Sequence, residues 1–301
     1  MVDSFLREIN YLRISITDRC NLNCIYCKPE NSKHYDKNEI LSYEEILRLC
    51  AIFASLGVQN FRITGGEPLM RKDCIPFVNK LKAIGSVGLT TNATLLRPHI
   101  HELKDIAVNI SLNSFENNEV LKAVEEAANA GIKTKTNTVL LKGINDNQIL
   151  PIASMAEKLP IHVRFIELMP TAANEGLIGV SSAQVLETIK SKYEDLTPNR
   201  ETYGNGPAIY YKSNSLLGSI GLISPIGENF CHSCNRLRLS STGFLRLCLH
   251  HNRGLDLRPL LRLGASDADI KQAIASCLAE KPRQHFLENE TIVKDMSKIG
   301  G

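Results

Sequence analysis

The sequence predicts an α/β protein in which parallel strands alternate with helices and close into a full or partial barrel. Strand-like segments recur at residues 11–17, 60–64, 87–91, 106–112, 133–140 and 162–168. Apolar residues at helical spacing separate them, as at Ile46, Leu49 and Phe53, and Ser42 and Glu45 have the spacing of a capping box. Such units pack as right-handed βαβ crossovers, and a flat doubly wound sheet is the alternative.

Most of these strands carry one polar face. In an ordinary barrel of parallel strands, Val, Ile and Leu fill the interior. If the polar faces point inward, the barrel is open and holds a polar ligand, because buried cations without a counter-charge are too costly. The alternative turns these faces to solvent. Four of the residues are cations that would suit a polyphosphate: Arg13, Arg62, Lys135 and Arg164.

Composition limits the classes of protein to consider. The 301 residues, 43% hydrophobic, suffice for one large domain, or one large and one small. We place a boundary near the Gly- and Pro-containing loop at residues 203–207, which gives domains 1–210 and 211–301. Lys+Arg 35 against Asp+Glu 32 argues against a nucleic-acid-coating protein. Without an apolar run of 18 residues or a leader-like N-terminus, we expect a cytoplasmic protein with no membrane partner.

The loop after the first strand carries Cys20, Cys24 and Cys27 in the spacing C-x3-C-x2-C. Three thiolates can hold three corners of a [4Fe–4S] cube and leave the fourth iron open to another ligand. A zinc site with a distant fourth ligand, or buried thiols without metal, are the alternatives. After the second strand, Gly65 and Gly66 would let the backbone approach a ligand closely.

A second cysteine triad follows near the C-terminus, at Cys231, Cys234 and Cys248. An open iron–sulfur cluster and a zinc site completed by a nearby histidine fit this spacing equally well. Arg236 and Arg238 lie two apart in a predicted strand and therefore on one face, where they favour an anionic or carbonyl-rich ligand. We expect the other cysteines to be core residues: Cys50, Cys74 and Cys277.

The segment LRISITDRCNLNCIYC resembles the signature of the radical S-adenosylmethionine (SAM) enzymes, and GGEP resembles their motif for the SAM amino group. Nearly every landmark is similar to one family, the GTP 3′,8-cyclases of molybdenum cofactor biosynthesis. The further landmarks are GLTTN, KTN with KGIND, RFIELM, CHSCNRLRLS and the terminal IGG. The chain is somewhat short, its third strand ends TTNA rather than TTNG, Asn113 replaces the family's aspartate, and Asn60 stands where lysine is common.

The resemblance implies two [4Fe–4S] clusters, one on each triad, with the second meeting the guanine base. The implied SAM contacts are Tyr26, Gly66, Ser111 and Met169. The implied GTP contacts are Arg13, Arg62, Thr90, Lys135, Arg236, Leu237 and Arg238. The terminal Gly300 and Gly301 resemble a tail that enters the active site and is needed for activity. The expected catalytic groups are the first triad, Arg236, Arg238, Gly300 and Gly301.

The implied activity is that of a lyase converting GTP to (8S)-3′,8-cyclo-7,8-dihydroguanosine 5′-triphosphate. A 5′-deoxyadenosyl radical from SAM would remove H3′ of GTP, and the C3′ radical would attack C8. The implied fold is a partial (β/α)6 barrel whose mouth is closed by a smaller C-terminal α+β region. The implied partners are ferredoxin or flavodoxin as electron donor and cyclic pyranopterin monophosphate synthase as recipient of the product, with a homodimer left open.

Two other functions remain as alternatives at this stage. A radical SAM enzyme with an auxiliary cluster could modify a peptide, and a zinc-stabilised binding module would have no catalysis. Iron content separates the last from the others, because two cubes hold about eight irons.

Overall fold

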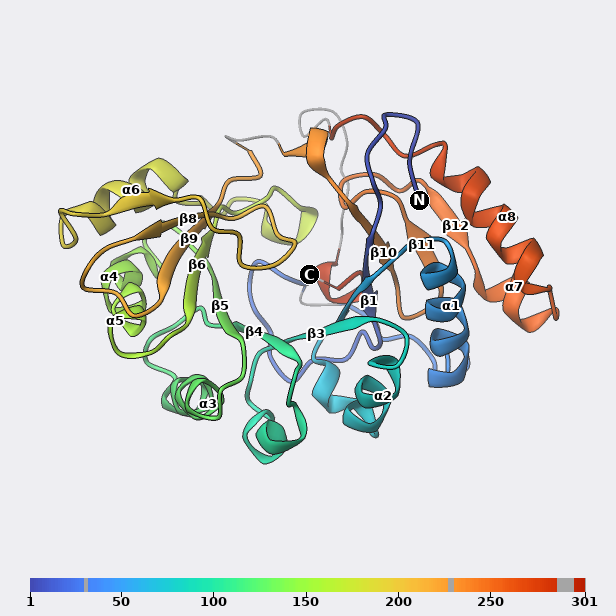
Figure 1. Ribbon diagram of the computed structural model, residues 1–301, viewed down its shortest axis with the longest axis horizontal. Coiled ribbons are helices and arrows are strands. Elements are labelled where there is room, and N and C mark those ends of the chain that lie inside the picture. Colours follow the sequence, from blue (N-terminus) through green and yellow to red (C-terminus); the bar gives the residue numbers. More distant parts are fainter. Residues whose placement is uncertain (30–31, 227–229, 286–294, 301) are drawn as a thin grey trace. The chain divides into compact units, whose positions relative to one another are not determined.

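The computed structural model in Figure 1 describes residues 1–29, 32–226, 230–285 and 295–300. The chain forms two compact units. The first comprises Met1–Leu89, Pro170–Glu175 and Cys231–Gly301, and the second comprises Thr90–Met169 and Gly176–Phe230. These units are defined by contacts, and the domain boundary after residue 210 stays a prediction.

The sheet of the first unit has the strand order β12-β11-β10-β1-β2-β3. Strands β10, β1, β2 and β3 run parallel, while β11 and β12 are antiparallel additions. The bounds are β1 Tyr11–Ser15, β2 Asn60–Thr64, β3 Ser86–Thr91, β10 Arg236–Leu239, β11 Phe244–Arg246 and β12 Gly254–Asp256. The last two residues of β3 belong to the second unit.

Helices cover the apolar face of this sheet. They are α1 Tyr43–Ser55, α2 Cys74–Leu81, α7 Arg258–Arg262 and α8 Asp267–Leu278. The unit also contains the 3-10 turns η1 Pro68–Met70, η4 Ala172–Asn174, η5 Cys231–Ser233 and η6 Met296–Lys298. The predicted capping box of α1 is confirmed: the Ser42 hydroxyl accepts from the Glu45 N–H, and the Glu45 carboxylate accepts from the Ser42 N–H. Helix α8 lies against α1 (Figure 1).

The second unit repeats the alternation of strands and helices. Its strand order is β4-β5-β6-β9-β8-β7, with the first four strands parallel. The strands are β4 Ala107–Ser111, β5 Thr134–Val139, β6 His162–Ile166, β7 Thr197–Asn199, β8 Ile209–Lys212 and β9 Ser219–Ile223. The helices are α3 Asn118–Asn129, α4 Ile149–Ala153, α5 Met155–Lys158 and α6 Ser182–Lys190, with 3-10 turns η2 Arg97–Glu102 and η3 Asp146–Gln148.

The predicted α/β class is confirmed, and each of the six expected strands lies within two residues of its predicted bounds. One connection differs. Between β3 and β4 the chain forms the 3-10 helix η2 instead of an α-helix, because this crossover spans only residues 92–106 and carries Pro98. The three cysteines assigned to the core are buried. Within the described residues, no helix is long and apolar enough to cross a membrane.

Candidate active site with two cysteine triads

The first triad lies in the loop that leaves β1. Its three thiols are half-buried, and the Cys27 N–H donates to the Cys24 carbonyl at 3.0 Å. Burial, followed by the charges of Cys24 and Cys20, raises the pKa of Cys27 to about 12. The thiolates therefore lie close enough to repel one another, and a bound metal centre would relieve that repulsion. This donor set fits a cluster.

The glycine turn after β2 is joined to this cysteine loop. The Gly66 N–H donates to the Thr17 carbonyl at 2.7 Å, and the Glu67 N–H donates to the Arg19 carbonyl at 2.8 Å. A Cβ on Gly66 would lie 2.3 Å from the Arg19 carbonyl oxygen. The sequence predicted close approach to a ligand, and the structure shows close approach to the loop that carries Cys20.

The second triad surrounds the start of β10. Cys231 belongs to η5, Cys234 follows it, and Cys248 lies just beyond β11. Burial first, then the charges of Cys248 and Cys234, raises the pKa of Cys231. Burial also acts to raise the pKa of Cys234, but Lys281 and the Arg236 backbone N–H outweigh it, and the pKa is lowered. The protein itself therefore stabilises the anionic form of the Cys234 thiol.

The geometry bears on the choice between zinc and iron–sulfur clusters. Among the residues that the structure describes, no three His, Cys, Asp or Glu side chains converge on a point where they could hold one metal ion. A mononuclear zinc ion needs such convergence, whereas the three thiolates of a cube bind three different irons. The sequence offers His232, His250 and His251 as a fourth zinc ligand, and of these His250 lies beside His285, with ring centroids 5.0 Å apart. Each triad supplies the three free thiols that three irons of a cube require.

Three arginines stand in a row on neighbouring strands of the first unit. The register pairs Arg13 of β1 with Arg238 of β10 on one side and with Arg62 of β2 on the other. Register neighbours in parallel strands project from the same face of the sheet. Burial, followed by the charges of Arg13 and Arg236, lowers the pKa of Arg238 to about 9. A row of like charges in this environment calls for an anionic ligand.

A glycine makes room for this row. The register places Gly88 of β3 beside Arg62, and a Cβ on Gly88 would lie 2.3 Å from the central guanidinium carbon. Arg62 Nε donates to the Tyr11 hydroxyl at 3.1 Å, and Nη1 donates to the Leu89 carbonyl at 3.2 Å. Gly88 is not among the site residues predicted from the sequence, although a glycine inside a strand is a signal of close approach.

The second unit carries its own polar rows. Lys135 of β5 lies in register between Asn109 and His162, while Asn137 lies between Ser111 and Arg164. Lys135 and Arg164 are buried, so the alternative in which the polar faces turn to solvent is wrong for these two cations. The buried side-chain oxygens of Asn109 and Asn137 have no hydrogen-bond partner among the residues that the structure describes. Unsatisfied buried oxygens of this kind fit a site that a polar ligand completes.

Other predicted contact residues of the second unit lie close to strand ends. Ser111 ends β4, Thr90 lies in β3, and Met169 follows β6. The Thr90 hydroxyl is buried and finds no hydrogen-bond partner in the described parts of the chain. Asn113 accepts the Val139 N–H at 3.1 Å through its side-chain oxygen, so the amide provides a hydrogen-bond acceptor where the family has a carboxylate.

The C-terminal tail lies against the polar face of the first unit. The Met296 N–H donates to the Cys27 carbonyl at 2.8 Å, and Arg238 Nη1 donates to the Gly300 carbonyl at 2.7 Å. A Cβ on Gly300 would lie 2.5 Å from the Thr64 methyl group. Gly301 lies outside the described residues. The tail therefore contacts both the loop of the first triad and one arginine of the row.

The fold and the two cysteine loops define the class, which is that of the radical SAM proteins. The family model of the Radical SAM superfamily matches residues 14–156, and that of Molybdenum Cofactor Synthesis C matches residues 161–287. The GTP 3′,8-cyclase of Pelotomaculum thermopropionicum is 39% identical over 325 aligned residues, covering 100% of both chains. That of Thermodesulfovibrio yellowstonii is 40% identical over 324, with the same coverage. The chain belongs to the GTP 3′,8-cyclase family.

Solved structures support the fold. SuiB of Streptococcus suis bound to S-adenosylmethionine has a TM-score of 0.63 and 17% identity, covering 91% of this chain and 68% of that one. The same protein bound to its precursor peptide SuiA has 15% identity. Likeness at this level concerns the fold alone, so the predicted partial (β/α)6 barrel is confirmed, and the likeness gives no support to a peptide substrate.

Proposed function

We propose that this chain is a GTP 3′,8-cyclase that catalyses the first step of molybdenum cofactor biosynthesis. Its cofactors are two [4Fe–4S] clusters and SAM. The full-length likeness to named cyclases supports the activity. The observation that carries the substrate is the row formed by Arg238, Arg13 and Arg62, because three arginines on one face match the charge of a nucleoside triphosphate.

When bound, the cofactors would supply reductive cleavage of SAM to methionine and the 5′-deoxyadenosyl radical, which would take H3′ from GTP to form 5′-deoxyadenosine. The C3′ radical would then bond to C8, and one electron and one proton from the reductant and solvent would complete the 7,8-dihydro product. Cys20, Cys24 and Cys27 would hold the first cluster, and the second triad would hold the other. Because a primary carbon radical attacks many C–H bonds, the protein must fix the ribose and exclude water. The arginine row provides the anchor for the triphosphate.

The remaining site residues have assigned roles in this proposal. Leu237 alternates with Arg236 and Arg238, and its side chain is buried on the other face, so it would contact GTP through its backbone. Lys135 and Thr90 would complete the GTP contacts. The assigned SAM contacts are Tyr26, Gly66, Ser111 and Met169, with Gly300 and Gly301 as the tail needed for activity.

Ferredoxin or flavodoxin would supply the electron, and cyclic pyranopterin monophosphate synthase would take the product in the cytoplasm. A homodimer remains part of the proposal. No nucleic acid or membrane takes part.

The test is anaerobic incubation of the reconstituted protein with SAM, reductant and GTP. We expect 5′-deoxyadenosine to form in step with the loss of GTP. Deoxyadenosine formed equally well without GTP would assign the substrate elsewhere. Arg13→Met should weaken GTP binding about tenfold or more, since hydrogen bonds to charged groups contribute about 1.5–3 kcal/mol. Arg48→Met is the matched control, because Arg48 lies outside the arginine row and pairs with Asp267 of α8. Unchanged GTP affinity in Arg13→Met would favour the peptide-modifying alternative.

A further inference from the structure

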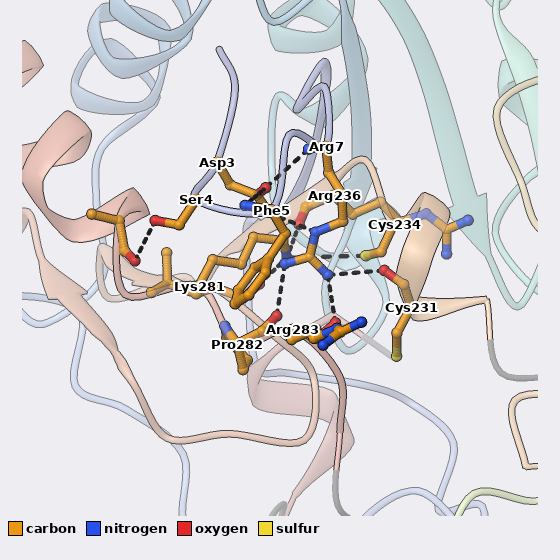
Figure 2. Close-up of polar contacts among 12 residues, drawn as sticks. Asp3, Ser4, Phe5, Arg7, Cys231, Cys234, Arg236, Lys281, Pro282 and Arg283 are labelled. Atoms are coloured by element: carbon orange, nitrogen blue, oxygen red, sulfur yellow. Dashed lines mark hydrogen bonds and ion pairs between the residues drawn. The ribbon is translucent and has the colours of Figure 1, made fainter.

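A buried ammonium group lies beside the second triad (Figure 2). Lys281 follows α8 and is only 2% exposed. Its Nζ donates to the Leu247 carbonyl, to the Arg236 carbonyl at 3.0 Å, and to Cys234 Sγ at 4.0 Å. Leu247 directly precedes Cys248, and Arg236 begins β10. One side chain therefore joins both backbone segments that carry these cysteines.

A second cation supports the same site from the N-terminus. Arg7 Nη1 donates to the Cys231 carbonyl at 2.8 Å, and Nη2 donates to the Pro282 carbonyl at 2.6 Å (Figure 2). Its Nε donates to the Asp3 carboxylate at 2.6 Å. Arg7 thus connects the loop of Cys231 with the residue next to Lys281 and holds that segment against the triad.

This network contains two cations, Arg7 and Lys281, and one carboxylate, that of Asp3. The Asp3 carboxylate also accepts the N–H groups of Phe5 and Arg7, so its hydrogen bonds serve Arg7 and the N-terminal turn. Within the described part of the chain, Lys281 Nζ hydrogen-bonds to carbonyl oxygens and a thiol, and the Asp3 carboxylate acts on it only through its charge. A buried ammonium needs an anion nearby. Thiolates bound to a cluster at the second triad would provide that negative charge.

We propose that Lys281 is a positioning residue for the second cluster and that its charge raises the reduction potential of that cluster. The inference rests on a cluster occupying the second triad and is independent of the substrate. Reduction adds one negative charge to a centre held by three thiolates, so a nearby buried cation favours the reduced form more than the oxidised form. A hydrogen bond to a cluster sulfur acts in the same direction.

The test uses the full-length chain with Cys20, Cys24 and Cys27 replaced by Ala, so that only the second cluster remains. An anaerobic redox titration followed by electron paramagnetic resonance compares this parent with Lys281→Met, Lys281→Arg and the control Lys271→Met on α8. In Lys281→Met we expect the ratio of reduced to oxidised cluster at a fixed potential to fall about tenfold, which is about 59 mV for a one-electron couple. Lys281→Arg should have a ratio of reduced to oxidised cluster close to that of the parent, and Lys271→Met should have the same ratio as the parent.

Iron per chain is measured on each protein. A Lys281→Met protein with full iron and the parent potential would overturn the proposal. If Lys281→Met binds no iron while Lys281→Arg keeps iron and potential, the requirement for a cation is upheld. If neither variant binds iron, the shape of the side chain matters instead of its charge, and the proposal fails. No GTP is present, so these results do not depend on the cyclase assignment.

Discussion

At the scale of single residues, several positions in this protein require glycine because a Cβ atom would collide with a neighbouring segment. Gly66 is the clearest, because its missing side chain lets the turn after β2 bond to the loop that carries the first triad. Neither the strand nor the loop alone would demand glycine there. The requirement arises only where the two backbones meet.

We predict that Gly66→Ala will lose SAM binding and bind less iron at the first triad. The added Cβ would lie 2.3 Å from the Arg19 carbonyl oxygen, so the turn and the loop must separate. Overpacking of this kind costs about 1–3 kcal/mol. Equilibrium binding of SAM and iron per chain check the prediction, with Gly206→Ala, whose Cβ has room, as control. Normal SAM affinity in Gly66→Ala would contradict it.

His162 predicts a dependence of stability on pH. Burial, followed by the charges of Lys135 and Arg164, lowers the pKa of His162 from its ordinary 6.5 to about 4. Between these values the unfolded chain binds a proton that the folded chain does not, so stability falls as pH drops from about 6.5 to about 4. The loss stays below about 3 kcal/mol, since one pKa unit is worth about 1.4 kcal/mol and water screens the half-exposed ring.

His162→Gln should reduce this loss, because glutamine does not titrate. The loss of stability is measured by thermal unfolding of the cluster-free chain at pH 7 and pH 5, monitored by circular dichroism. The control is His101→Gln, an exposed residue of η2. An identical drop in melting temperature for the parent and His162→Gln would refute the assignment to His162.

At the scale of elements, the pairing of parallel strands brings single arginines together on one face of the sheet. Strands β10, β1 and β2 come from distant parts of the sequence, yet their register places one arginine of each side by side. The next strand in order, β3, contributes Gly88 at the same level. In the second unit, Gly221 of β9 stands in the same relation to Arg164 of β6. Glycines in strands thus make room for cations on their neighbours.

We predict that Gly88→Ala will raise the KM for GTP several-fold with little change in kcat, because the new methyl group displaces the Arg62 guanidinium. Steady-state kinetics check this. The double variant Gly88→Ala with Arg62→Ala should be no worse than Arg62→Ala alone, since both changes remove the same contact. Additive losses in the double variant would mean that Gly88 acts elsewhere, for example on the strand itself.

At the scale of the whole molecule, segments near both ends of the chain contact the loops that carry the cysteine triads. Near the N-terminus, Arg7 bonds to the Cys231 carbonyl, and near the C-terminus, Met296 bonds to the Cys27 carbonyl. The Asp295 carboxylate accepts the Ser297 N–H at 3.0 Å and the Ser32 hydroxyl, while Lys298 lies 4.8 Å from the centre of the Tyr35 ring. Docking of the tail is therefore specified by side chains as well as by Gly300.

We predict that Asp295→Ala will lower turnover and speed removal of C-terminal residues by carboxypeptidase, because the tail loses its bonds to Ser32 and Ser297. Iron content should stay at about eight per chain, two cubes of four. Ser32→Ala should give a smaller effect of the same kind, and the double variant should resemble Asp295→Ala because the two residues share one bond. Equal carboxypeptidase rates for the parent and Asp295→Ala would show that Asp295 does not dock the tail.

The sequence by itself determined the α/β class, the six strands, the capping box of α1 and the cysteine triads. These depend on local spacing: alternation for strands, a period of 3.6 for helices, and ligands only a few residues apart. Asn113 could be noticed as a departure, but its bond to the Val139 N–H depends on a strand that begins 21 residues later.

Only the tertiary structure decided the arginine row and the space that Gly88 leaves for Arg62. It also decided the contact of Gly66 with the cysteine loop and the position of Lys281 beside Cys234. Each joins residues that are distant in the chain and close in space. Local pattern carries no information on which strand pairs with which, because register follows from packing of the whole core. The spacing of the cysteines points to metal centres, and the fold alone determines which charges surround them.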